Sequence, residues 1–197
     1  MKSTSIPECI KNKQMVNLFT YMNYLIDTQD FTFDHIENPL IRNELSYWAN
    51  NGGYCIYMSI LFIAVATNSG LLQKQDIHYY QGVYEYRGNR DLVLLIPAFE
   101  RQLGLHAWLC INNSVVDLTA NQHASTFDGA ISKLPIVIGE YNPNYKLTGF
   151  KETPTTIDWY MNKFSQFQHM SVDEWITYHC QQVQLYVAAN NLNTVIS

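Results

Sequence analysis

The apolar run from Tyr54 to Ala66 constrains the fold more than any other feature of the sequence. It contains no charged residue, and its apolar side chains fall on nearly every side of a helix. A helix that is apolar all round must be buried, and this run is too short to cross a bilayer, which takes about 20 residues. The sequence therefore predicts a central core helix from Cys55 to about Asn68, ended by Ser69 and Gly70.

Helical patterns precede and follow this central helix. Asn38 and Pro39 supply an N-cap and a first-turn proline, while Ser171 and Glu174 form the pattern of a capping box. Elsewhere, apolar residues recur at helical spacing. The expected helices cover approximately residues 11–27, 39–51, 55–68, 155–167 and 171–191.

Between these helices, alternating and aromatic-rich segments predict strands. Such strands are expected over residues 77–86, 103–111, 114–119 and 134–141, and residues 91–96 are an ambiguous fifth candidate. Helices first, an antiparallel sheet in the middle and helices last indicate the α+β class. No linker divides the 197 residues, so we expect a single domain over 1–197 with its core at roughly 50–140.

Composition excludes several classes of function. The formal net charge is −5 and no cluster of Lys and Arg is present, which argues against nucleic-acid binding. The N-terminal segment has no apolar core of a cleaved secretion signal. We therefore expect a cytoplasmic protein, or one exported by a route without a cleaved signal peptide, and no membrane partner. The oligomeric state is left open.

Cysteine and glycine patterns bear on cofactors and redox state. The four cysteines are widely spaced and form no CxxC motif, which favours free thiols in a reducing compartment. No phosphate-binding loop or dinucleotide fingerprint is present, so no nucleotide cofactor is expected. Cys110 is too far along its strand from His106 to share a metal with it, and no metal site is predicted.

The segment "LHAWLCINNSVVDLT", residues 105–119, predicts a β-hairpin. Asn tolerates the positive φ that tight hairpin turns need, so a turn at Asn112 and Asn113 would pair Ile111 with Ser114. The same register pairs Trp108 with Asp117 and His106 with Thr119. These four side chains would then share one face, with the His106 imidazole within reach of the Asp117 carboxylate.

Cys55 supplies the nucleophile that such a pair lacks. It opens the central helix, where the macrodipole and unpaired N–H groups stabilise a thiolate. The same N–H groups can hold the oxyanion of a tetrahedral intermediate. Gly53, two residues upstream, removes side-chain bulk where a substrate would approach.

Together, these three segments resemble the transglutaminase-like superfamily. The residues that carry the resemblance are Gly53-Tyr54-Cys55 at a helix start, His106-Ala107-Trp108 on a strand, and Asp117-Leu118-Thr119 on the next. They match the family pattern of Gly-x-Cys, His-Ala-Trp and an Asp followed by Pro or Leu and Thr, in the same order, over roughly a third of the chain.

The resemblance implies a papain-like fold and a Cys-His-Asp triad. Cys55 would be the nucleophile, His106 the general base and acid, and Asp117 the carboxylate that orients the imidazole. Members of this superfamily cleave, deamidate or transfer acyl groups at amide bonds through a thioester, without a cofactor. The expected partner is a protein or peptide with a reactive carboxamide or peptide bond, and hydrolysis is favoured because water is the default acceptor.

The surrounding residues are given weaker roles. Gly53, Tyr54 and Trp108 are the candidate substrate-binding residues, with Tyr54 expected to border the cleft and Trp108 to belong to the core or a pocket wall. The Cys55 N–H is the first oxyanion donor. The second donor is open among Asn50, Asn51 and Gln122.

Structural explanations compete with each of these roles. A cysteine in an apolar helix is most often a core residue, His106 could be a satisfied core histidine, and Asp117 could simply cap a turn. A second hypothesis for the whole chain is a catalytically silent binding module or effector that uses the same cleft to grip a protein partner.

Overall fold

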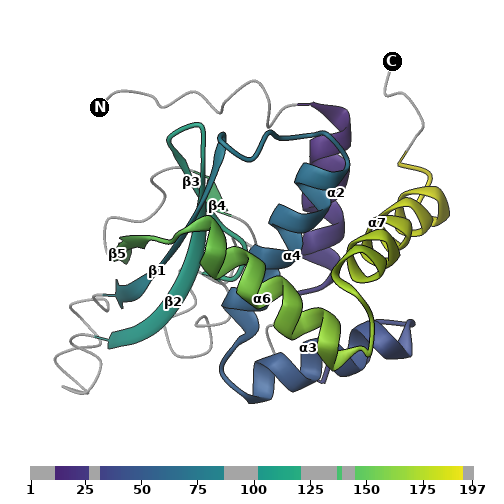
Figure 1. The fold of residues 1–197 in the computed structure, drawn as a ribbon, viewed down its shortest axis with the longest axis horizontal. Helices are drawn as coiled ribbons and strands as arrows, with labels where there is room; N and C mark the ends of the chain where they lie inside the picture. Colours follow the sequence, from purple (N-terminus) through teal and green to yellow (C-terminus); the bar gives the residue numbers. More distant parts are fainter. Residues whose placement is uncertain (1–11, 27–31, 87–101, 121–136, 139–144, 193–197) are drawn as a thin grey trace, which may run out of the picture.

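The computed structural model describes residues 12–26, 32–86, 102–120, 137–138 and 145–192. These residues form a mixed helix and sheet structure, which confirms the α+β class (Figure 1). The helices are α2 (Lys13–Tyr24), α3 (Pro39–Asn50), α4 (Tyr54–Asn68), α6 (Pro154–Phe167) and α7 (Val172–Ala189). The strands are β1 (Ile77–Tyr86), β2 (Gln102–Ile111), β3 (Ser114–Asp117), β4 (Val137–Ile138) and β5 (Tyr145–Lys151).

Helix α4 is the centre of the molecule, as its apolar sequence predicts. It packs against α2, α3, α6 and α7 and against β1 and β2. Every residue from Tyr57 to Ala66 is buried. Figure 1 shows the other helices gathered around α4 on one side of the sheet. None of the helices in the described ranges is both long and apolar enough to cross a membrane.

Side-chain caps begin all the described helices except α4. Asn12, Asn38, Thr153 and Ser171 each accept a hydrogen bond from a backbone N–H in the first turn of α2, α3, α6 and α7. The N-cap of α4 is Gly53, which has no side chain and makes no such bond. The first-turn N–H groups of α4 are therefore not occupied by a cap.

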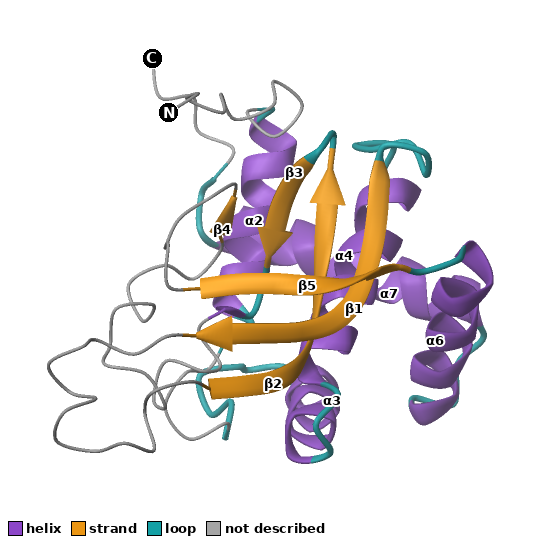
Figure 2. Ribbon diagram, turned by 90° about the vertical axis from the view of Figure 1, so that its left-hand side faces the viewer, coloured by secondary structure: helices purple, strands orange, loops and turns teal. Residues whose placement is uncertain are grey.

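The sheet is antiparallel, with its strands in the order β4-β3-β2-β1-β5. Figure 2 shows that β1 and β2 curve strongly along their length and that β5 runs along the bent half of β1. The sequence does not predict β5, because Lys146, Gly149 and Lys151 weaken its strand signal. Lysine is common on exposed edge strands, which is where β5 lies. The candidate strand at residues 91–96 lies outside the described residues.

The predicted hairpin register is confirmed over its first three pairs. Asn112 and Asn113 have φ angles of 47° and 65°, and Ile111 pairs with Ser114. The ladder of β2 and β3 stops at Leu109 and Val116, so the predicted pairs of Trp108 with Asp117 and of His106 with Thr119 are not part of it. Strand β3 ends at Asp117, and the chain turns there. Within the described ranges, the cysteines Cys55, Cys110 and Cys180 are free.

Candidate active site

Three elements bring together the three residues that the sequence singles out. Cys55 lies in the first turn of α4, His106 lies in the middle of β2, and Asp117 ends β3. The three residues are almost fully buried, with exposed fractions of 5%, 3% and 0%. Residues that are up to 62 positions apart in sequence therefore meet at the contact between α4 and the hairpin.

The His106 imidazole and the Asp117 carboxylate form a buried pair. His106 Nε2 lies 2.8 Å from Asp117 Oδ2. The other carboxylate oxygen, Oδ1, accepts a hydrogen bond of 3.1 Å from the backbone N–H of Thr119. Asp117 therefore does both things that the sequence allows: one oxygen caps the turn after β3, and the other orients the imidazole.

Cys55 lies near the imidazole as well. Burial lowers the pKa of His106, but the charge of Asp117, the hydrogen bond with Asp117 and the neighbouring Cys55 raise it, and the net pKa lies well above the ordinary value of 6.5. Since Asp117 takes Nε2, Nδ1 is the ring nitrogen that remains to exchange a proton with another group. An imidazolium held between a carboxylate and a thiol is an arrangement suited to a thiolate nucleophile.

The backbone around Cys55 points to the same chemistry. Tyr57 donates the first helical hydrogen bond of α4, to the Gly53 carbonyl, at 2.9 Å. The Cys55 N–H lies ahead of this bond and belongs to the first-turn groups that have no acceptor within the helix. It is aligned with the positive end of the helix dipole and can donate to a developing oxyanion.

Two of the weaker assignments gain no support from the contacts that the structure shows. Tyr54 is 3% exposed, and its hydroxyl donates to the Leu25 carbonyl at 2.9 Å. Asn51 is exposed, and its side-chain amide donates to the Tyr47 carbonyl at 2.7 Å, at the end of α3. Helix phase alone does not tell which neighbour a first-turn side chain meets.

The remaining candidates have varied surroundings. A side chain at Gly53 would place its Cβ 3.2 Å from the Trp48 ring, so the ring would have to shift slightly to accept any larger residue there. Trp108 is buried and lies beside His106. Asn50 is exposed at the end of α3, and Gln122 lies outside the described residues.

A buried tyrosine near the sulfur was not predicted as part of the site. Tyr79 on β1 is fully buried. Burial raises its pKa, and the neighbouring Tyr160 and Cys55 raise it further, so its hydroxyl stays protonated beside the thiol. Gln81, two residues along β1, donates to the Tyr160 hydroxyl at 3.1 Å. In the sequence, only the alternation of aromatic residues over 77–86 pointed to a tyrosine near the site. The same alternation is equally expected of an ordinary half-buried sheet surface.

Among the residues that the structure describes, no three His, Cys, Asp or Glu side chains are grouped closely enough to hold a metal ion. Comparison with known proteins adds nothing further: no family model, curated protein or solved structure matches this chain. The transglutaminase-like resemblance therefore rests on the three segments around Cys55, His106 and Asp117 alone.

Proposed function

We propose that this protein is a cysteine-dependent acyl-transfer enzyme that acts on amide bonds, built on a papain-like, transglutaminase-like core. One observation carries the proposal: a cysteine at an uncapped helix N-terminus lies near an imidazole whose Nε2 lies 2.8 Å from a buried carboxylate. A core cysteine needs neither the uncapped helix start nor the oriented imidazole.

The first half-reaction would form a thioester. His106 Nδ1 takes the thiol proton of Cys55, and the Cys55 sulfur attacks the carbonyl carbon of a carboxamide or peptide bond. The Cys55 N–H supports the resulting oxyanion. When the tetrahedral intermediate collapses, the C–N bond breaks and the imidazolium gives its proton to the departing amine or ammonia. Asp117 keeps the imidazole oriented and stabilises its charge.

The second half-reaction would release the acyl group. Water, or an amine, loses a proton to His106 Nδ1 and attacks the thioester carbonyl carbon. The C–S bond breaks and the sulfur leaves as the thiolate, which restores the thiolate and imidazolium pair. Water as acceptor makes the protein a peptidase or deamidase, and an amine makes it a transferase. We favour hydrolysis, with a protein or peptide as substrate.

The acyl-enzyme can be sought directly by intact-protein mass spectrometry. The protein is incubated with glutamine-containing and unmodified peptide pools and quenched in acid, which preserves thioesters. We expect a mass adduct at Cys55 that hydroxylamine removes, absent in Cys55→Ala and retained in Cys110→Ser. Cys110 is the matched control because it is a free thiol on β2.

Release of ammonia, peptide cleavage or incorporation of an added amine then identifies the acceptor. If no adduct forms and the folded Cys55→Ala protein behaves as the wild type does in every assay, the chain is not an acyl-transfer enzyme. The non-catalytic binding module would then be the better account.

A further inference from the structure

Aromatic rings surround the imidazole of His106. The Trp108 and His106 rings lie 6.3 Å apart between centroids and 22° from parallel. Tyr84 meets the imidazole nearly edge-on, at 5.9 Å and 83°. Tyr80 stacks on the Trp108 indole at 5.8 Å and 13°. These separations are those of attractive aromatic pairs, so His106 ends a stacked row that begins at Tyr80.

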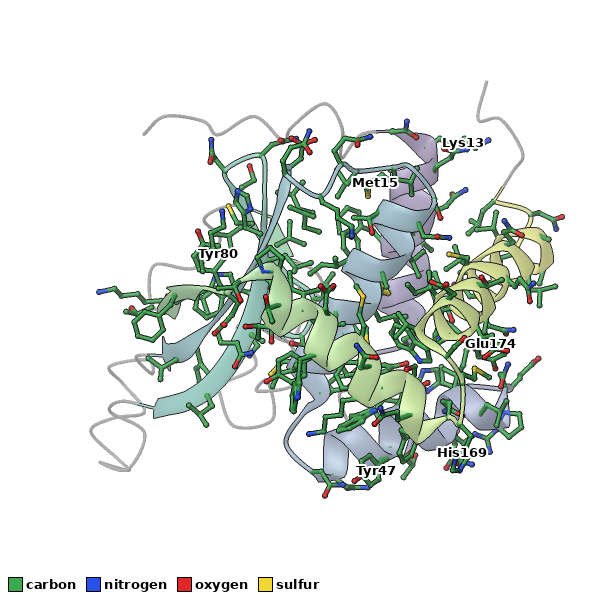
Figure 3. The ribbon with its side chains drawn as sticks, in the orientation of Figure 1. Lys13, Met15, Tyr47, Tyr80, His169 and Glu174 are labelled. Carbon is green, nitrogen blue, oxygen red and sulfur yellow. The ribbon has the colours of Figure 1, made fainter. Side chains whose placement is uncertain are left out.

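The sheet register places these rings on one face. Tyr80 pairs with Trp108, and Gly82 pairs with His106, across β1 and β2. Tyr84 follows Gly82 by two residues and therefore points the same way. Figure 3 shows Tyr80 among the side chains of the sheet, on the opposite side of the molecule from α7. The row is thus built by the sheet and not by the helical layer.

Gly149 leaves the space in which the Trp108 indole lies. Gly82 on β1 pairs with His106 on β2 and with Gly149 on β5. Of these three neighbouring positions in the sheet, only His106 has a side chain. A Cβ on Gly149 would lie 2.6 Å from Trp108 Cη2 and 2.2 Å from the Gln81 carbonyl oxygen. The indole therefore occupies the space that any side chain at position 149 would need.

This arrangement restricts the imidazole from three directions. Asp117 holds Nε2, the Trp108 ring lies alongside the imidazole face, and the Tyr84 ring meets it at a right angle. Displacement of a catalytic group by about 1 Å can cost two orders of magnitude in rate. The Trp108 and His106 ring centroids are 6.3 Å apart, at the outer edge of the range over which the π face of a tryptophan attracts a cation such as an imidazolium.

We propose that Trp108, seated against Gly149, is a positioning residue that fixes the His106 imidazole toward Cys55 and favours its protonated form. The structural part of this inference concerns the imidazole alone. Its consequence for reactivity rests on the proposed function.

The test compares Trp108→Phe with Trp108→Leu. Phenylalanine keeps an aromatic face, whereas leucine keeps only apolar bulk. Trp159→Leu is the matched control, because Trp159 is an exposed tryptophan on α6. Two quantities are measured on folded protein: the pKa of the His106 ring by NMR titration, and the rate at which iodoacetamide labels Cys55.

We expect Trp108→Leu to lower the pKa of His106 and to slow Cys55 labelling about tenfold or more. Trp108→Phe should restore most of both quantities, and Trp159→Leu should leave both unchanged. If folded Trp108→Leu has the wild-type pKa and labelling rate, the inference is wrong.

Fluorotryptophan keeps the test decisive if Trp108→Leu does not fold. Fluorine withdraws π electron density while nearly keeping the shape of the indole, so incorporation into wild-type protein should lower the pKa of His106. Incorporation into Trp108→Phe protein should have no effect. An unchanged pKa in the fluorinated wild type overturns the favoured protonation.

The two proposals fail separately. If the His106 pKa responds to these changes but Cys55 labels no faster than the other thiols, the positioning inference stands and the proposed function fails. If Cys55 labels rapidly in every variant, the proposed function stands and the positioning inference fails.

Discussion

Asp117 shows how one side chain can satisfy two explanations that compete at the level of sequence. Its Oδ1 accepts from Thr119 and its Oδ2 faces His106 Nε2. That the His106 and Asp117 side chains lie on the same face of the hairpin could be predicted, because the strand register follows from the turn at Asn112 and Asn113. The hydrogen bonds of the Tyr54 and Asn51 side chains could not be predicted, because they depend on which backbone carbonyl lies beside each side chain in the folded protein.

Substitution of Asp117 by Asn tests the buried pair at this scale. The raised pKa of His106 means that its protonation adds stability that is complete below about pH 6.5 and is lost as the pH rises through the folded-state pKa. Asp117→Asn removes the charge that raises it. Below pH 6.5, we expect the unfolding free energy of the variant to be about 3 kcal/mol lower than that of the wild type. This difference in unfolding free energy should become smaller at higher pH.

Urea denaturation at several pH values measures this gap, and NMR titration should show the pKa of His106 falling in the same variant. Thr119→Val is the control, because the backbone N–H that caps Oδ1 is kept. A gap between Asp117→Asn and wild type that stays constant with pH would contradict the assigned pair.

At the scale of elements, local signals and long-range contacts differ in how far they could be predicted. The starts of α3 and α7 follow from Asn38-Pro39 and from the Ser171 capping box, which the structure confirms. Strand β5, which carries Gly149, was not predicted, because an edge strand with lysines and a glycine has little apolar alternation. Its place in the sheet is fixed by pairing with β1, which no local pattern shows.

The junction of α3 with α7 contains a buried carboxylate that was also not predicted. Glu44 is fully buried, and its oxygens accept hydrogen bonds from Trp175 Nε1 at 2.9 Å and Gln168 Nε2 at 3.2 Å. His179 Nε2 lies 3.4 Å from the same carboxylate. These partners lie more than 120 positions from Glu44, so no spacing rule connects them.

We expect Glu44→Ala to lower the unfolding free energy by about 3 kcal/mol, because it leaves the buried indole N–H of Trp175 on α7 without its acceptor. Glu37→Ala, at an exposed position just before α3, should change it little. Urea denaturation of both variants measures the difference. Equal, small losses would show that Glu44 does not tie α3 to α7.

At the scale of the whole molecule, a buried helix carries the proposed nucleophile and a curved sheet carries the groups proposed to activate it. The apolar sequence of α4 predicts its central place, and the hairpin predicts the His106 and Asp117 pair. That the start of α4 meets this pair follows from packing across the whole chain, and only the family resemblance suggested it beforehand. The central claim is therefore that Cys55 and His106 act as a unit.

The pH dependence of Cys55 alkylation tests this claim most directly. Rates with iodoacetamide are followed by peptide mass spectrometry from about pH 5 to pH 8, below the pKa of an ordinary thiol, in wild type and His106→Ala. Cys110 and Cys180 are the reference thiols, and burial raises the pKa of Cys110. We predict that Cys55 reacts faster than both reference thiols at pH 6 and slows about tenfold or more in His106→Ala. Equal rates at all three cysteines, unchanged by His106→Ala, would contradict the account.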